Sequence, residues 1–191
     1  MTKTGIFGGS FNPIHNGHIA LARQLREAAG LDEVWLMVSP QNPLKEQTGL
    51  LADDLRLQMA QQALADDPDI HVSDYEFHLP RPSYTWNTLQ ALRTDFPDHE
   101  FTLLIGGDNW EHFHHWYRAD DIISNYQLIV YPRRGSDIDL TSLPPTVSVV
   151  EAELLDISST DIRRRVRRRQ PITGLVPDSI LDTVNKYYQQ S

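Results

Sequence analysis

The sequence predicts an α/β fold, a doubly wound parallel sheet in a single domain that spans residues 1–191. Short apolar runs of strand length alternate along the chain with longer segments of helical periodicity, a pattern typical of parallel strands joined by helices. A glycine-rich turn connects the first apolar run to the first helical segment. The length of 191 residues and the hydrophobic content of 40% suit one domain with its own core.

Each expected element rests on its local pattern. Apolar runs predict strands at residues 5–7, 34–38, 70–72, 101–105, 128–131 and 147–150. Apolar residues at helical spacing predict helices at residues 19–29, 52–65, 84–92, 160–169 and 177–190. Residues 135–145 are rich in Asp, Ser and Pro and are expected to form an exposed loop. Ligands of such sheets bind beyond the carboxyl ends of the strands, so functional residues are expected there.

Composition restricts the class of protein. The formal net charge is −9, whereas nucleic-acid-binding surfaces are basic, so we expect no nucleic-acid partner. Cysteine is absent, which excludes a disulfide framework and a thiolate metal site. The sequence has no apolar run of about 18 residues and begins without a signal-peptide core, so we expect a cytoplasmic enzyme with no membrane span. A homo-oligomer and a monomer both stay open.

The first chemical motif is the stretch GGSFNPIHNGH at residues 8–18, between the first strand and the first helix. Small residues let the backbone come close to a ligand, and free N–H groups at a helix N-terminus favour anions. His15 and His18 lie three residues apart at the first helical turn, where they can hydrogen-bond phosphate oxygens. The motif therefore predicts phosphate binding by the two histidines and by the loop residues Gly8, Gly9, Ser10 and Phe11.

A second anion site is predicted near the other end of the chain, in the stretch ISSTDIR at residues 157–163. Ser158, Ser159 and Thr160 are good N-cap residues, and their hydroxyls and free backbone N–H groups favour an anion. Arg163 lies one turn into the helix and offers a planar guanidinium to the same anion. Together the two motifs predict a triphosphate held between two helix N-termini.

Two other stretches have competing interpretations. Residues 163–169, RRRVRRR, are typical of a nucleic-acid site or of a solvated helix face, and the negative total charge favours the second. His112, His114 and His115 could ligate a metal, but their spacing is not diagnostic and a surface helix turn is favoured. No third ligand accompanies His15 and His18 in the sequence, so we assign no metal site to protein side chains.

The two anion motifs resemble the signatures of the HxGH nucleotidylyltransferase superfamily, GxFDPxHxGH and ISSTxIR, whose fold is Rossmann-like. The first motif departs from the signature at Asn12, where the superfamily usually has Asp. Asparagine keeps the turn-forming shape and loses the charge. Two matches in this order, near opposite ends of one small domain, favour a nucleotidylyltransferase over a glycine turn of purely structural purpose.

Four further segments resemble bacterial nicotinate-nucleotide adenylyltransferases, and the resemblance spans nearly the whole chain. The segments are residues 40–45, 81–89, 104–109 with Trp116, and 175–188. Leu44 departs from the family pattern, because a leucine cannot donate a hydrogen bond to phosphate as histidine would. The resemblance implies transfer of AMP from ATP to nicotinate mononucleotide, which yields nicotinic acid adenine dinucleotide and pyrophosphate in NAD biosynthesis.

The resemblance also implies roles for individual residues. The catalytic set is His15, His18, Lys45 and Arg163. ATP would be bound by these two histidines and Arg163 together with Gly8, Gly9, Ser10, Phe11, Gly106, Arg133, Ser158, Ser159 and Thr160. The acceptor would be bound by Tyr84, Thr85, Asp108 and Trp116. Trp116 would stack on the pyridine ring, and Thr85 with neighbouring N–H groups would bind the nicotinate carboxylate. Mg²⁺ would be held mainly by the ATP phosphates and water.

Several alternatives stay open at this point. Nicotinamide mononucleotide and 4′-phosphopantetheine are other acceptors for the same chemistry. A non-catalytic nucleotide-binding module would keep the fold without turnover. An RNA-binding protein that uses the arginine run would show strongly salt-dependent RNA affinity.

Overall fold

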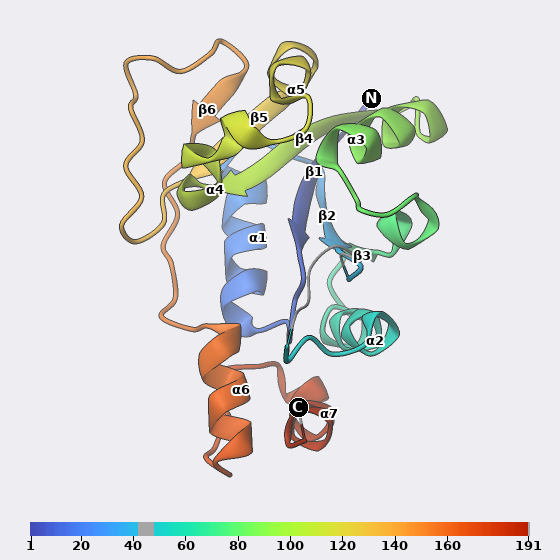
Figure 1. The fold of residues 1–191 in the computed structure, drawn as a ribbon, viewed down its shortest axis with the longest axis vertical. Coiled ribbons are helices and arrows are strands. Elements are labelled where there is room, and N and C mark those ends of the chain that lie inside the picture. Colours follow the sequence, from blue (N-terminus) through green and yellow to red (C-terminus); the bar gives the residue numbers. More distant parts are fainter. Residues whose placement is uncertain (42–47, 191) are drawn as a thin grey trace.

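Six parallel strands form one sheet within residues 1–41 and 48–190, which this computed structural model describes (Figure 1). The strands are β1 (Thr2–Gly9), β2 (Glu33–Val38), β3 (Ile70–Ser73), β4 (His99–Gly106), β5 (Gln127–Tyr131) and β6 (Val147–Val149). Their spatial order is β3-β2-β1-β4-β5-β6, and every neighbouring pair is parallel. The order reverses between β1 and β4, which defines the switch point where ligands bind in doubly wound sheets.

Between the strands lie α1 (Asn16–Ala28), α2 (Asp53–Ala63), α3 (Thr85–Asp95), α4 (Gly107–Glu111) and α5 (Ala119–Asn125), and after β6 come α6 (Ser159–Arg167) and α7 (Leu181–Tyr188). Short 3₁₀ helices lie at Tyr75–His78, Phe113–His115 and Asp178–Ile180. The predicted α/β class and the predicted strands are confirmed. The predicted loop at residues 135–145 contains neither helix nor strand.

Several expected boundaries were wrong by two or more residues; the first helix begins at Asn16 instead of Ile19, and β4 begins at His99 instead of Phe101. The first strand begins at Thr2 instead of Gly5, because backbone pairing with β2 and β4 continues through polar residues that the sequence pattern does not mark as strand. Thr4, for example, is fully buried and its hydroxyl contacts Glu33 and His99 at 2.9 and 2.8 Å. The helix expected at residues 177–190 is divided into a 3₁₀ turn and α7, with Ile180 fully buried at the junction.

The sheet is covered on both faces, because successive side chains of a strand point to opposite sides. In β1, Phe7 packs with the core cluster that includes α1, α2, α6 and α7, whereas Ile6 packs with the cluster that includes α3 and α5. This arrangement gives three layers, with the sheet between two groups of helices (Figure 1).

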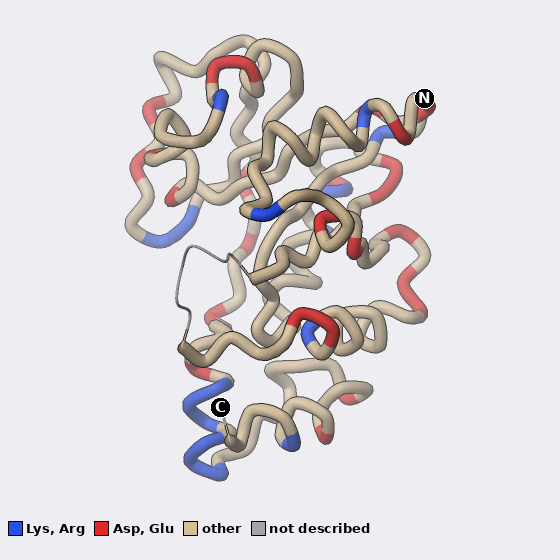
Figure 2. Tube along the Cα trace, turned by 45° about the vertical axis from the view of Figure 1, so that its right-hand side comes forward, with Lys and Arg blue, Asp and Glu red and all other residues tan. Residues whose placement is uncertain are grey.

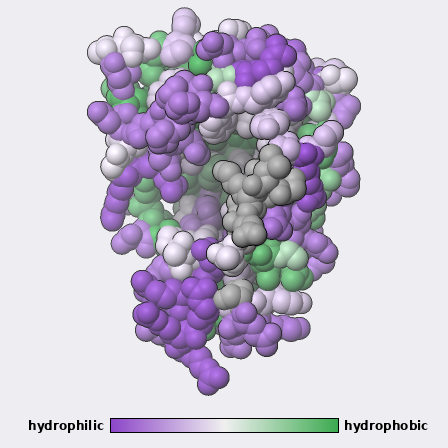
Figure 3. Space-filling model, viewed as in Figure 1, coloured by the Kyte–Doolittle hydropathy of each residue, from purple (hydrophilic) through white to green (hydrophobic). Residues whose placement is uncertain are grey.

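The arginine run lies on α6 and beyond its end, as the solvated-face interpretation predicted. Ile162 and Val166 bury the apolar side of the helix, while Arg164 and Arg165 form ion pairs with Asp161. Figures 2 and 3 show this helix as a basic, hydrophilic projection at one end of the molecule. None of the helices among the described residues is long and apolar enough to cross a membrane.

Candidate active site

The candidate site lies at the switch point, where the loop after β1 and the loop after β4 begin. Three cavities of the described part surround the residues that the sequence singled out. We call them the histidine cleft, the arginine cleft and the deep pocket. Their volumes are about 410, 440 and 210 Å³, respectively.

The two histidines are fixed by the first turn of α1. His15 is the N-cap residue, and its Nδ1 accepts hydrogen bonds from the backbone N–H groups of Gly17 and His18 at 3.0 and 3.3 Å. In return, the N–H group of His15 donates to Nδ1 of His18 at 3.1 Å, which completes a capping box. Because both Nδ1 atoms accept, the proton of each neutral ring lies on Nε2. The two rings stack with centroids 3.6 Å apart.

The surroundings keep both rings neutral. Burial, and secondarily the positive charge of Arg133, lowers the pKa of His15 from 6.5 to about 4. Burial lowers the pKa of His18 well below its ordinary value, with further contributions from His15 and Arg133. Both imidazoles are therefore uncharged hydrogen-bond donors near pH 7.

The histidine cleft brings together residues from both anion motifs and from the loop after β5. Its lining includes His15, His18, Arg133, Ser158, Ser159 and Thr160, all predicted to bind ATP. Ser158 caps α6 as expected, because its hydroxyl accepts from the backbone N–H of Asp161 at 3.1 Å. Two exposed leucines, Leu154 and Leu155, add an apolar wall to the cleft beside its histidines, arginines and hydroxyls.

The two motifs, distant in sequence, are joined by direct hydrogen bonds. The Ser159 hydroxyl donates to the carbonyl of Pro13 at 2.9 Å, and Nη1 of Arg163 donates to the carbonyl of Asn12 at 2.8 Å. Beside this junction lies the arginine cleft, lined by Ser10, Asn12, Thr48, Leu50, Ser159, Thr160 and Arg163. Serine and threonine hydroxyls next to a guanidinium suit an anion.

The deep pocket lies on the β4 side and contains two of the predicted acceptor-binding residues. Thr85 and Trp116 line it together with Gly8, Gly9 and the apolar side chains of β4. Thr85 is the first residue of α3. The N-terminus of this helix has no side-chain cap, so the first backbone N–H groups of α3 are available to a ligand. A small, largely apolar cavity with a few polar groups is typical of a site for a ring-shaped ligand.

Sequence reasoning missed Ser83 in this pocket. Its hydroxyl oxygen is the one buried side-chain polar atom without a hydrogen-bond partner in the described part of the chain. Such an atom loses free energy unless a ligand or water satisfies it. The signal was present in the sequence, since Ser83 directly precedes Tyr84 and Thr85 in the segment that resembles the family.

Glu76 was also missed, because a single glutamate in a short 3₁₀ helix belongs to no motif. Its side chain lines the deep pocket and is 7% exposed. The Thr88 and Ser39 hydroxyls donate to its carboxyl oxygens at 2.9 and 3.4 Å. Burial raises the pKa of the Glu76 carboxyl, and the hydroxyl of Thr88 opposes this shift. The residue links the end of β2 to α3.

The remaining predicted residues within the described part of the chain do not appear among the linings of the three cavities. Phe11 is buried behind His18, with ring centroids 4.9 Å apart, so its side chain supports the histidine. Tyr84 is 42% exposed and packs on Tyr117 outside the pocket lining. Gly106 ends β4, and the Asp108 that follows lies with its carboxylate 3.9 Å from Nε of Arg133. Lys45 and Leu44 lie outside the described residues.

Within residues 1–41 and 48–190, no group of three or more His, Asp or Glu side chains is arranged to hold a metal ion. His112, His114 and His115 are exposed in and beside a 3₁₀ turn.

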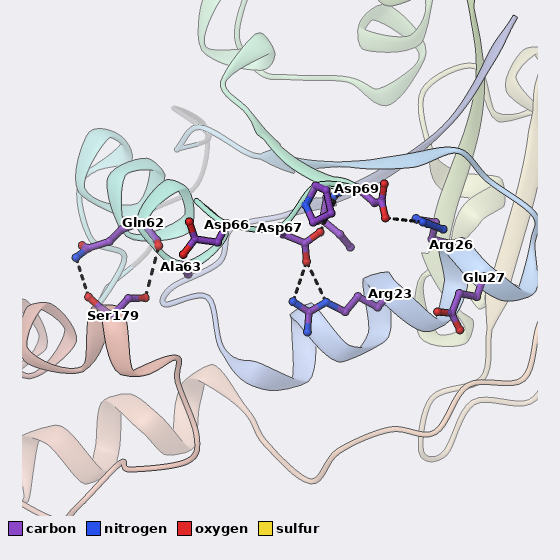
Figure 4. Close-up of a pocket in the computed structure, with 11 residues that line it drawn as sticks. Arg23, Arg26, Glu27, Gln62, Ala63, Asp66, Asp67, Asp69 and Ser179 are labelled. Atoms are coloured by element: carbon purple, nitrogen blue, oxygen red, sulfur yellow. Dashed lines mark hydrogen bonds and ion pairs between the residues drawn. The ribbon is translucent and has the colours of Figure 1, made fainter.

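A further cavity of about 390 Å³ lies away from these residues, between α1 and the turn after α2 (Figure 4). Both of its arginines are engaged with carboxylates, since Arg23 pairs with Asp67 and Arg26 pairs with Asp69. We do not assign it to the site, because none of the predicted site residues lines it.

Comparison with known proteins is consistent with this geometry. The Cytidylyltransferase-like family model matches residues 6–165. A relative from Bacteroides fragilis named "probable nicotinate-nucleotide adenylyltransferase" is 54% identical over 162 residues, which cover 85% of this chain and 81% of the relative. A Bacteroides thetaiotaomicron relative of the same name is 46% identical over 189 residues, covering 99% of this chain and 94% of its own length.

A solved structure, Plasmodium falciparum nicotinic acid mononucleotide adenylyltransferase complexed with NaAD, has a similar fold. It superposes with a TM-score of 0.81 at 20% sequence identity, over 100% of this chain and 99% of the other. The fold, the joined anion motifs and the sequence relatives agree. This chain is a nucleotidyltransferase and belongs, within the Cytidylyltransferase-like family, to the nicotinate-nucleotide adenylyltransferases.

Proposed function

We propose that this chain transfers AMP from ATP to nicotinate mononucleotide, with ATP across the histidine and arginine clefts and the nicotinate ring in the deep pocket. The observation that carries this assignment is the pair of stacked, neutral imidazoles of His15 and His18 at the N-terminus of α1. Their Nε2–H groups are free of the capping box and can donate to phosphate oxygens. The clefts and the pocket lie around the loop that holds them.

The reaction needs positioning and charge stabilisation more than proton transfer. An oxygen of the nicotinate mononucleotide phosphate attacks the α-phosphorus of ATP, the bond from that phosphorus to the bridging β-oxygen breaks, and pyrophosphate leaves. The attacking phosphate is already anionic at neutral pH, so no general base is required. His15, His18 and the N-termini of α1 and α6 donate to the transferred group, while Arg163 neutralises charge on the leaving pyrophosphate.

The acceptor assignments follow from the lining of the deep pocket. Trp116 would stack on the pyridine ring, and the first N–H groups of α3, beginning at Thr85, would bind its carboxylate. We add the Ser83 hydroxyl as a further donor, because it is buried in this pocket and has no hydrogen-bond partner in the described part of the chain. Asp108 and Tyr84 would contact the acceptor near the pocket mouth. Lys45 remains a proposed phosphate ligand.

Nucleotidyl transfer generally uses a divalent metal ion. We propose Mg²⁺, held mainly by the ATP phosphates and water, which fits a site whose described residues form no dedicated cage. The ion would supply charge neutralisation of the triphosphate. We place the reaction in the cytoplasm.

Pyrophosphate release with ATP and Mg²⁺ tests the proposal directly. Nicotinate mononucleotide, nicotinamide mononucleotide and 4′-phosphopantetheine would be compared as acceptors under the same conditions. We expect clear preference for nicotinate mononucleotide. Turnover only with another acceptor would overturn the assignment of Thr85, Ser83 and Trp116, and no turnover with any of them would favour a nucleotide-binding module.

The histidines carry the first mutational prediction. We expect His18→Ala to lower kcat by about a hundredfold or more, since one preorganised donor to the transferred phosphate is lost. Circular dichroism and thermal unfolding would check that the variant is folded. His78→Ala is the matched control, because His78 is exposed on the 3₁₀ helix before α3 and should leave kcat unchanged. Near-normal turnover of folded His18→Ala would refute the role.

A further inference from the structure

The C-terminal helix reaches the phosphate-binding loop through one buried hydrogen bond. Tyr188, the last residue of α7, is fully buried, and its hydroxyl donates to Oδ1 of Asn12 at 2.7 Å. The two residues are separated by 176 positions in sequence. Asn12 itself is 7% exposed. A buried polar contact of this kind fixes both partners, because neither can turn to water instead.

Every polar group of the Asn12 side chain is used in this arrangement. Besides the Tyr188 hydroxyl, Oδ1 accepts from the backbone N–H of Leu51 at 3.2 Å. Nδ2 donates to the carbonyl of Gly49 at 2.9 Å. The side-chain amide therefore has one orientation. It ties the loop after β1 to residues 49–51 and to the end of the chain.

The main chain of Asn12 in turn holds a proposed phosphate ligand. Its carbonyl accepts from Nη1 of Arg163 at 2.8 Å, and the Thr160 hydroxyl lies 3.4 Å from Nη2. Arg163 lines the arginine cleft together with Asn12 and Ser10. A shift of the Asn12 peptide would therefore move the guanidinium relative to the cleft.

The electrostatic environment keeps the Tyr188 phenol in its donor form. Burial raises the pKa of Tyr188 above its ordinary value, although the nearby guanidinium groups of Arg56 and Arg163 act in the opposite direction. Arg56 is itself fully buried and donates to the carbonyl of Ser10 in the same loop at 2.6 Å. The phenol therefore lies near two cations that both bind the backbone of the phosphate loop.

We propose that Tyr188 is a positioning residue for the triphosphate, which acts through Asn12 to hold Arg163 at the arginine cleft. The inference rests on the proposed assignment of ATP to that cleft and adds a role for α7 in it. Tyr188 is fully buried and is not among the residues that line the histidine cleft or the arginine cleft. Its effect should fall on the β- and γ-phosphates that Arg163 neutralises, and it should spare the adenosine and the acceptor.

Tyr188→Phe is a direct test, because it removes one hydroxyl and keeps the buried ring. Binding of a non-hydrolysable ATP analogue and of AMP would be measured by titration calorimetry, and KM for nicotinate mononucleotide by pyrophosphate release. We expect the analogue to bind roughly three- to tenfold more weakly, because a displaced Arg163 guanidinium loses part of its contact with the phosphates. AMP affinity and KM for the acceptor should change less than twofold. Tyr187→Phe, at the neighbouring position, is the matched control.

A double-mutant cycle separates positioning from general destabilisation. In an Arg163→Met background, Tyr188→Phe should weaken binding of the ATP analogue no further, because its effect passes through Arg163. An equal further loss in that background would overturn the proposal. So would analogue affinity within twofold of the unmodified protein, or equal weakening of ATP analogue, AMP and acceptor.

The binding measurements also keep this inference distinct from the proposed reaction. If the unmodified protein turns over no nicotinate mononucleotide while Tyr188→Phe still weakens the ATP analogue selectively, the reaction assignment fails and the positioning role stands. If the unmodified protein shows normal turnover and Tyr188→Phe leaves the affinity for the ATP analogue unchanged, the reaction assignment stands and the positioning role fails.

Discussion

At the scale of single residues, hydrogen-bond partners decide the chemistry of His15 and His18. Backbone N–H groups occupy both Nδ1 atoms, so each ring offers one Nε2–H group and no charge. Burial is the main cause of both lowered pKa values, with Arg133 as the second cause for His15, whereas for His18 the neighbouring His15 ring, 3.6 Å away between centroids, lowers the pKa further. Positive charge for the phosphates must then come from other groups, with Arg163 and Arg133 the described candidates.

Ser83 gives a prediction at the same scale. We expect Ser83→Ala to raise KM for nicotinate mononucleotide roughly three- to tenfold, since a hydrogen bond to the carboxylate is lost. KM for ATP should not change. Because the hydroxyl has no hydrogen-bond partner among residues 1–41 and 48–190, the melting temperature should stay the same or rise.

Ser124→Ala is the control for this variant. Ser124 is exposed on α5, where its hydroxyl bonds only to the carbonyl of Asp120. Steady-state kinetics with both acceptors would measure the effect. If Ser83→Ala leaves the preference for nicotinate over nicotinamide mononucleotide intact, the Ser83 hydroxyl does not bind the carboxylate.

At the scale of elements, Gly8 near the end of β1 and Gly17 in the first turn of α1 have opposite requirements. A Cβ at Gly17 would lie 2.9 Å from Cε1 and Nδ1 of His15, so the ring would have to shift. A Cβ at Gly8 would meet nothing within 4 Å and would project into space beside the deep pocket. Gly17 therefore leaves space for the His15 ring of the protein itself, whereas Gly8 leaves space for a ligand.

The same substitution at these two positions should therefore act differently. We expect Gly17→Ala to lower both activity and stability, the latter by about 1 kcal/mol through the disturbed cap. We expect Gly8→Ala to lower kcat/KM at least about tenfold with an unchanged melting temperature, since substrate and not protein meets the new methyl group. Thermal unfolding together with pyrophosphate release would measure both variants, and a Gly8→Ala protein with full activity would contradict the placement of the acceptor.

The boundaries of helices and strands show where the local sequence pattern is sufficient to predict an element. Strands of apolar residues, such as β2 and β5, were predicted to within one residue, because burial on both faces leaves a continuous apolar run. β1 was predicted too short, since its polar start is held by neighbouring strands. α4 and α5 carried too weak a periodicity to be predicted separately.

At the scale of the whole molecule, the buried histidines should make stability depend on pH. Their pKa values are lowered in the folded protein, to about 4 for His15, against 6.5 when unfolded. Above pH 6.5 both states are neutral and the stability is fully present. As the pH falls from 6.5 toward 4, the unfolded chain takes up protons that the folded chain does not. The free energy of unfolding should then fall by up to about 1.4 kcal/mol per pH unit for each histidine.

Urea unfolding between pH 4 and 8 would measure this effect. His15→Asn isolates it, because asparagine is a good N-cap residue and does not titrate. The variant should show a shallower loss of stability below pH 6.5 than the unmodified protein, whereas His78→Gln should show the same loss. Identical slopes in His15→Asn and the unmodified protein would mean that His15 is not held neutral by the fold.

The sequence by itself determined the α/β class, the positions of the strands, the two anion motifs and the family, because these depend on periodicity and on residue types within short segments. The catalytic and binding roles of the individual site residues all stay predictions, including those of His15, His18 and Arg163. Only the tertiary structure revealed the tautomers of His15 and His18, the unpartnered Ser83 hydroxyl and the Asn12–Tyr188 contact. These features depend on which atoms meet across the fold, and residues separated by 176 positions carry no local sign of their contact.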